Sequence, residues 1–140
     1  MNEKHQVDYA ALILRLSLGT MLLAHGLLKV LVFTLPGTAQ FFTSVGFPGW
    51  LAYPVVAMEV GGGLLMLGGV ATRWVALALV PVMLGALSVH WGNGWGFSGA
   101  NGGWEYPALL AVLMLGQALL GPGAYAIGAL GGKEARVAHA

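Results

Sequence analysis

Residues 9–32 read YAALILRLSLGTMLLAHGLLKVLV, a run long enough to cross a bilayer that also contains Arg15, His25 and Lys29. About 20 apolar residues span the hydrocarbon core as a helix, so a charge inside such a run is costly and rarely accidental. At about 100° per residue, the three ionisable side chains fall on one flank of the helix, together with Gly26. We expect this flank to face protein or a watery cavity, because lipid would leave the charges unpaired.

The rest of the chain shares this apolar character. Of its 140 residues, 58% are hydrophobic and 8% are charged, and the mean hydropathy is +0.80. Soluble proteins carry about 25% charged residues, so the composition predicts a single all-α integral membrane domain in contact with the lipid bilayer. The net charge of +1 comes without any basic run, which argues against nucleic acid as a partner. The lack of cysteine excludes disulfides, thiolate metal sites and thiol catalysis by this chain.

Apolar stretches separated by helix breakers predict a four-helix bundle within residues 9–130. The predicted membrane spans are 9–32, 51–70, 73–90 and 105–120. Residues 1–8 and 131–140 are interpreted as a polar lead and a polar tail.

Three local features refine the predicted bundle. Aromatic residues and helix breakers between the first two spans favour a short amphipathic piece over 38–44. Thr72 is a predicted N-cap of the third span. Glycines at positions 61–63 in the second span would let a neighbouring backbone approach closely.

The distribution of basic residues predicts the orientation of the bundle. Lysines and arginines outside the span interiors lie at the two ends of the chain or beside the short second loop, at Lys4, Arg73, Lys133 and Arg136. The first and third loops contain neither residue type. By the positive-inside rule, both termini and the second loop are cytoplasmic. The expected location is the cell (inner) membrane, as a multi-pass protein.

Ionisable residues from all four spans are predicted to gather in the outer half of the membrane. Counted at about 1.5 Å per residue, they lie roughly 3 to 13 Å outward from the midpoints of their spans: His25, Lys29, Glu59, His90 and Glu105. Arg15 falls roughly 8 Å on the inner side. Glu59 lies nearest mid-membrane and must be protonated or paired, with Lys29, Arg15 and His25 as candidate partners.

Each of these residues also has a simpler structural interpretation. Lys29 could snorkel to water, His25 could be a satisfied core histidine, and His90 could be only interfacial. Glu105 could be a favourable charge at a helix N-terminus, and Arg15 could pair with an acid or snorkel inward. Convergence at one depth is what favours a shared site.

The aromatic and imidazole side chains leave two further possibilities. Trp91 belongs to an aromatic girdle that is typical of bilayer anchors, although a quinone ring also favours such surroundings. His25 and His90 lie at similar depths on different helices, so bis-imidazole ligation of haem is a lesser alternative.

An ordered set of short motifs runs along nearly the whole chain, from Leu12 to Gly123: Arg15 and Gly19, His25-Gly26, Lys29, Phe41-Phe42, Gly46-Phe47-Pro48, Glu59, Gly62-Gly63, Gly68, Thr72-Arg73, His90, Glu105-Tyr106-Pro107 and Gly121-Pro122-Gly123. Together these motifs resemble the DoxX family of small four-helix membrane proteins. The resemblance implies a link to thiosulfate:quinone oxidoreductase, to terminal quinol oxidase subunits and to redox-stress membrane complexes. One departure is that relatives often continue with Ser-Leu-Asp where this chain has Ala126-Ile127-Gly128.

Two hypotheses follow. In the first, the chain is a membrane subunit of a quinone-linked oxidoreductase, with a redox partner subunit or a second copy of itself. Its catalytic residues would be Glu59, His25 and Lys29. The residues expected to bind the substrate in the same outer pocket are Arg15, His90, Trp91 and Glu105. In the second hypothesis, the chain is a non-enzymatic assembly or small-solute transport protein, and its intramembrane ion pairs are structural. The sequence leaves both open, and with them whether the chain is itself an enzyme.

Overall fold

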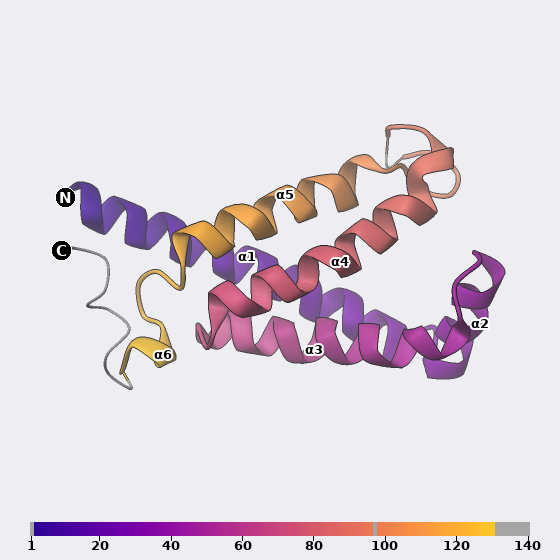
Figure 1. Ribbon diagram of the computed structural model, residues 1–140, viewed down its shortest axis with the longest axis horizontal. Helices are drawn as coiled ribbons and strands as arrows, with labels where there is room; N and C mark the ends of the chain where they lie inside the picture. The colour runs from indigo at the N-terminus through magenta and orange to yellow at the C-terminus, as the bar shows by residue number, and fades with distance from the viewer. Residues whose placement is uncertain (1, 97, 131–140) are drawn as a thin grey trace.

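The computed structural model describes residues 2–96 and 98–130, and the regular structure in this part of the chain is entirely helical (Figure 1). The elements in chain order are α1 (Glu3–Leu31), α2 (Leu35–Ser44), η1 (Gly49–Leu51), α3 (Ala52–Gly68), α4 (Thr72–His90), η2 (Trp91–Asn93), α5 (Glu105–Leu120) and α6 (Ile127–Leu130). The predicted polar tail, 131–140, lies outside the described residues.

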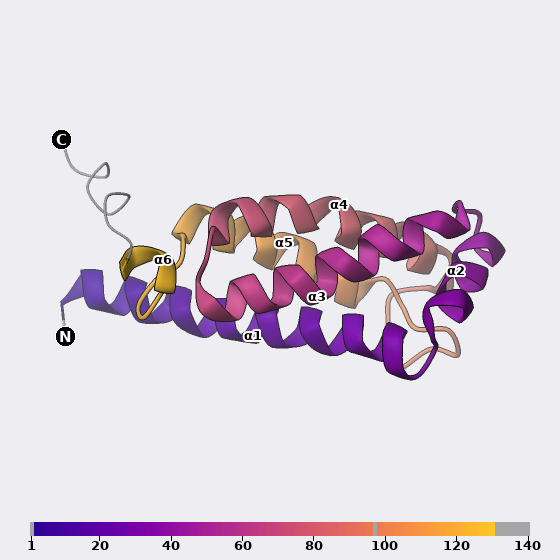
Figure 2. The ribbon, with the colours of Figure 1, turned by 90° about the horizontal axis from the view of Figure 1, so that it is seen from below.

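In the described part of the chain, four long helices form the bundle, and the short α-helices α2 and α6 add to it. Helices α1 and α3 lie side by side, as do α4 and α5, while α2 crosses one end (Figures 1 and 2). Among the described residues, three stretches are long and apolar enough to cross a membrane, namely α1, η1 with α3, and α4 with η2. The fourth predicted span is α5, a shorter apolar helix of 16 residues. The expected four-helix membrane bundle is therefore found in its broad form, with more helices than predicted.

Helix α1 begins at Glu3, earlier than the predicted start at Tyr9. The side chain of Asn2 accepts a hydrogen bond from the backbone N–H of His5 at 3.0 Å, and the acidic Glu3 follows in the first turn. Both features stabilise a helix N-terminus. The polar lead is therefore mostly the first turns of α1. The helix is about 43 Å long at 1.5 Å per residue, longer than the hydrocarbon core.

Glycines set the distance between α1 and α3. A Cβ atom at Gly63 would lie 2.8 Å from the backbone nitrogen of Leu23 and 3.0 Å from the carbonyl oxygen of Gly19. One at Gly26 would lie 2.7 Å from Cγ2 of Val60. Each distance is too short for a real side chain, so the two backbones touch where glycine allows it. The close approach expected at residues 61–63 is confirmed at Gly63.

The turn between α3 and α4 differs from the prediction. Gly69 ends α3 in a left-handed conformation with φ +71°, and Ala71 precedes α4 with φ +47°. Thr72 is already inside the helix, and within the described residues its buried hydroxyl has no hydrogen-bond partner. The predicted N-cap at Thr72 is wrong, because the tight turn draws this side chain into the first turn of α4.

Candidate functional site

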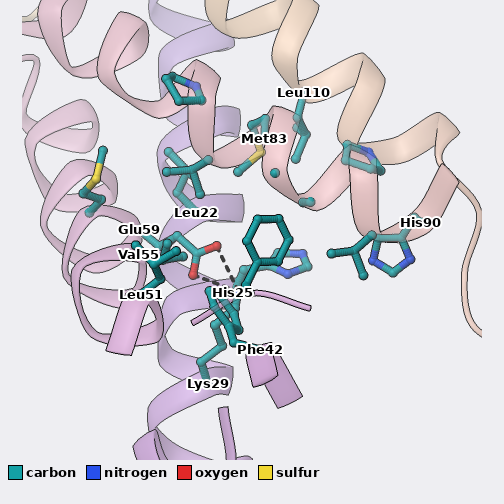
Figure 3. Close-up of a pocket in the computed structure, with 18 of the residues that line it drawn as sticks. Leu22, His25, Lys29, Phe42, Leu51, Val55, Glu59, Met83, His90 and Leu110 are labelled. Atoms are coloured by element: carbon teal, nitrogen blue, oxygen red, sulfur yellow. Dashed lines mark hydrogen bonds and ion pairs between the residues drawn. The ribbon is translucent and has the colours of Figure 1, made fainter. Parts of the chain in front are cut away.

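A cavity of about 540 Å³ lies at the α2 end of the bundle and receives residues from α1 to α5. This volume falls within the roughly 300 to 1,000 Å³ typical of small-molecule sites. Its wall is mainly aliphatic and aromatic, as at Leu22, Phe42 and Met83 (Figure 3). A few polar side chains interrupt the wall, all of them ionisable: His25, Lys29, Glu59, His90 and Tyr106.

An ion pair between α1 and α3 is the main polar feature of the cavity (Figure 3). The Nζ atom of Lys29 donates to both carboxylate oxygens of Glu59, at 2.9 and 2.8 Å. The side chain of Glu59 is 5% exposed and that of Lys29 is 21% exposed. The expectation that Glu59 is paired is confirmed, and of its three candidate partners the structure selects Lys29.

Local sequence explains why the two charges meet. Gly26 lies one helical turn before Lys29, and a Cβ atom there would lie 3.1 Å from Cβ of Glu59. The two helices are thus also close together beside the ion pair. Thr38 of α2 is 3% exposed, and its hydroxyl donates toward the carbonyl oxygens of Lys29 and Thr34, at 3.2 and 2.9 Å. This contact holds α2 over the end of α1.

A second polar contact joins α1 to α5 across the cavity. The hydroxyl of Tyr106 lies 3.4 Å from Nε2 of His25, and their ring centroids are 5.7 Å apart. We did not predict Tyr106 as a site residue. Its signal in the sequence is a polar aromatic side chain in the first turn of a span, next to Glu105 and at the depth of His25.

His90 lines the cavity from the end of α4 and also fixes the loop between α4 and α5. Its Nδ1 lies 3.2 Å from the carbonyl oxygen of Asn101 and 3.3 Å from that of Gly102. His25 and His90 therefore line one cavity, yet each imidazole already contacts a protein group. Ligation of a metal through Nε2 of His25 would break its contact with Tyr106.

Two predicted site residues flank the loop between α4 and α5 and are not on the cavity wall. Trp91 is 62% exposed and stacks on Trp104, with centroids 5.0 Å apart. Glu105 is half-buried at the start of α5, and its backbone N–H donates to the carbonyl oxygen of Trp95 at 3.2 Å. Neither residue lines the cavity, so the structure does not bring them together with the ion pair.

Arg15 does not line the cavity and lies toward the opposite end of the bundle, beside the end of α3. The fourteen residue steps from Arg15 to Lys29 correspond to about 21 Å along α1. Its guanidinium is buried and donates to the carbonyl oxygens of Met66 and Leu67 at 3.4 Å and of Ala124 at 3.0 Å. Arg15 thus fastens α1 to the end of α3 and to the segment after α5. The structure does not place it with the expected substrate-binding residues.

We expect the substitution Arg15→Met to lower the free energy of unfolding by about 2 kcal/mol, because buried carbonyl oxygens lose their donors. Thermal unfolding in a fixed detergent measures this loss. Arg73→Met is the matched control, since Arg73 is exposed and donates to one carbonyl oxygen, that of Ala118. Ligand affinity at the cavity should stay unchanged in both variants. A loss of ligand binding in Arg15→Met at unchanged stability would contradict this assignment.

The fold and the cavity define a helical membrane protein with an ion pair at the wall of a largely apolar pocket. The chain belongs to the DoxX family, whose sequence profile matches residues 10–91. This confirms the resemblance found in the sequence motifs. The matched region covers most of α1 through α4, including His25, Lys29 and Glu59, and ends before α5.

The chain is similar to the protein named "Putative oxidoreductase CatD" of Bacillus subtilis (strain 168). It is 37% identical to this chain over 87 residues, which are 62% of each protein. The matched region thus spans less than two thirds of the relative's length. No solved structure matches the chain.

Proposed function

We propose that this protein is a membrane subunit of a quinone-linked oxidoreductase and that its cavity binds the ring of a quinone or quinol. The observation that carries the proposal is the ion pair of Lys29 and Glu59 at the wall of an otherwise apolar cavity in a membrane bundle. Ionisable groups inside a membrane domain usually mark a functional site. Membership of the DoxX family and the name of the Bacillus subtilis relative support an oxidoreductase.

The wall of the cavity has the chemistry that a quinone ring requires. Phe42 and Phe47 supply aromatic surface for a flat ring, and the cavity volume is ample for one. A quinone carbonyl needs a hydrogen-bond donor, which His25 or His90 would supply. Tyr106 offers a further hydroxyl on the same wall.

The ion pair suits the proton movement that accompanies quinone chemistry. Reduction of a quinone to a quinol takes up two electrons and two protons. Glu59 is placed to exchange a proton with a ring oxygen, and the ammonium of Lys29 would stabilise negative charge there. The electrons would come from a partner redox protein. The role of this chain is to bind and orient the ring and to handle protons.

We propose that the cavity lies in the outer half of the inner membrane. The start of α1, the turn between α3 and α4, and α6 lie at one end of the bundle, and α2 lies at the other (Figure 1). Lys4 and Arg73 belong to the first of these ends, while residues 33–50 and 91–104 contain no lysine or arginine. By the positive-inside rule, the end with the cavity faces away from the cytoplasm.

A binding experiment tests the proposal directly. Decylubiquinone should raise the unfolding temperature of the purified protein saturably, and Glu59→Gln should weaken this effect by about tenfold in affinity. Glu3→Gln is the matched control, because Glu3 is exposed at the far end of α1. The absence of a saturable shift in the wild-type protein would refute quinone binding. Equal losses in both variants would show that Glu59 has no special part in it.

One observation favours the second candidate function, a structural ion pair in an assembly or transport protein. Both oxygens of Glu59 already accept from Lys29, so the pair is satisfied without any ligand. Such a pair pins α1 to α3 whether or not chemistry occurs. The two functions predict different behaviour when the whole pair is replaced by apolar residues, as argued in the Discussion.

A further inference from the structure

Helices α3 and α4 touch near the middle of the bundle and separate toward the α2 end. A Cβ atom at Gly62 would lie 3.0 Å from Cδ1 of Leu79 and 3.4 Å from Cγ1 of Val75, which marks the point of close contact. From there α4 moves away from α3, as Figure 1 shows. The two helices therefore leave a widening gap on the side where the cavity lies.

The residues that face one another across this gap are residues that line the cavity. In an antiparallel pair with Gly62 opposite Leu79, one turn toward α2 places Met58 opposite Val82 or Met83. The next turn places Val55 opposite Ala86. All five of these residues line the cavity. The cavity is thus the space that α3 and α4 would fill if they stayed together.

The same gap reaches the outer surface of the bundle. Ala78 and Pro81 of α4 line the cavity and are also exposed on the surface of the protein. Gly85, one turn after Pro81, adds no side chain, and a Cβ atom there would meet nothing within 4 Å. Across the cavity, α1 and α5 are joined by the contact between His25 and Tyr106. The opening therefore lies between α3 and α4.

This opening lies within the apolar part of the helices, so it leads to lipid hydrocarbon and admits only apolar groups. The polar end of the cavity is at the ion pair. We infer that the ligand is an amphiphile whose polar ring lies beside Lys29 and Glu59 and whose linear hydrocarbon chain passes between α3 and α4 into the lipid. This inference rests on the proposed quinone site and adds that the ligand reaches it sideways from the membrane.

A matched pair of glycine substitutions tests the opening. Gly85→Leu places a side chain in it, whereas Gly116→Leu adds the same side chain to α5 at a half-buried glycine that also has open space and does not line the cavity. The probes are decylubiquinone and the same benzoquinone ring without its chain, both titrated into nanodiscs of fixed lipid composition. Affinities are expressed as the ratio of quinone to lipid. Partitioning of the quinone's hydrocarbon chain into the membrane is then the same for all variants.

We expect Gly85→Leu to weaken binding of decylubiquinone by at least about tenfold and to leave the chain-free ring unaffected, while Gly116→Leu changes neither. If both probes bind and Gly85→Leu affects neither of them, the ring site stands and the opening between α3 and α4 is wrong. If neither probe binds the wild-type protein, the proposed function fails, and this inference fails with it.

A second measurement on the wild-type protein does not depend on the folding of a variant. A quinone with a photoreactive diazirine at the end of its chain is bound and irradiated, and the crosslinked residues are identified by mass spectrometry. We expect crosslinks to α3 and α4, at residues such as Met58, Val82 and Gly85, and their loss in excess decylubiquinone. Crosslinks confined to α1 and α5 would overturn the inference.

Discussion

Replacement of Lys29 by methionine, with Glu59 kept, is expected to lower the free energy of unfolding by about 3 to 5 kcal/mol. The reason is that the carboxylate of Glu59 is almost fully buried and would lose the ammonium that contacts both of its oxygens. Thermal or denaturant unfolding in a fixed detergent measures this change. Lys4→Met is the control, because Lys4 is exposed near the start of α1 and its loss should alter stability by less than about 0.5 kcal/mol.

The double substitution Lys29→Met with Glu59→Leu should recover most of this stability, since an apolar pair of similar volume often replaces a buried ion pair at little cost. Its effect on binding separates the two candidate functions. If the pair is part of a quinone site, the folded double variant loses the saturable effect of decylubiquinone. If the pair only holds α1 against α3, the double variant keeps any saturable effect of decylubiquinone that the wild-type protein shows. A double variant as unstable as Lys29→Met alone would contradict the structural account of the pair itself.

That Glu59 is paired was predictable, because an acid near mid-membrane requires a partner. Which of the three candidates is the partner was not predictable, and the structure selects Lys29. The presence of helices and most of their bounds were predictable from hydropathy and helix breakers. The position of Arg15 outside the cavity was not predictable. A shared helical flank gives the direction of a side chain but not its distance along the helix axis from the other residues of the site. Arg15 shares a flank with Lys29 yet lies about 21 Å along the axis, where it meets backbone carbonyl groups.

The remainder of the cavity depends on how the helices cross, which a single sequence does not specify. Phe42 and Phe47 fit the pattern of membrane-interface aromatics, yet they line the cavity because α2 folds across the end of the bundle. Trp91 fits the same pattern and is exposed. A close contact between α3 and α4 lies at Gly62, and the helices diverge from there. Nothing in hydropathy distinguishes Gly62 from Gly61, whose Cβ position meets no atoms within 4 Å.

The substitution Gly63→Leu is expected to lower the free energy of unfolding by about 3 kcal/mol or more, because its side chain would overpack the contact between α1 and α3. The nearest atoms to the added Cβ are the backbone nitrogen of Leu23 and the carbonyl oxygen of Gly19, and backbone atoms move only if the helices separate. Gly61→Leu is the matched control in the same helix. It should change stability by less than about 0.5 kcal/mol, or raise it, since leucine is also the better helix former.

The glycine contact and the ion pair should act as one unit, because Gly63 lies one turn from Glu59, and Gly26 lies one turn from Lys29. If α1 and α3 separate in Gly63→Leu, the ion pair is already weakened, so adding Lys29→Met costs less than it does alone. A double-mutant cycle measured by unfolding should therefore show a coupling of about 1 kcal/mol or more. The same cycle with Gly61→Leu should show none. Additive losses in the Gly63 cycle would mean that the ion pair holds its geometry without the close approach of the two backbones.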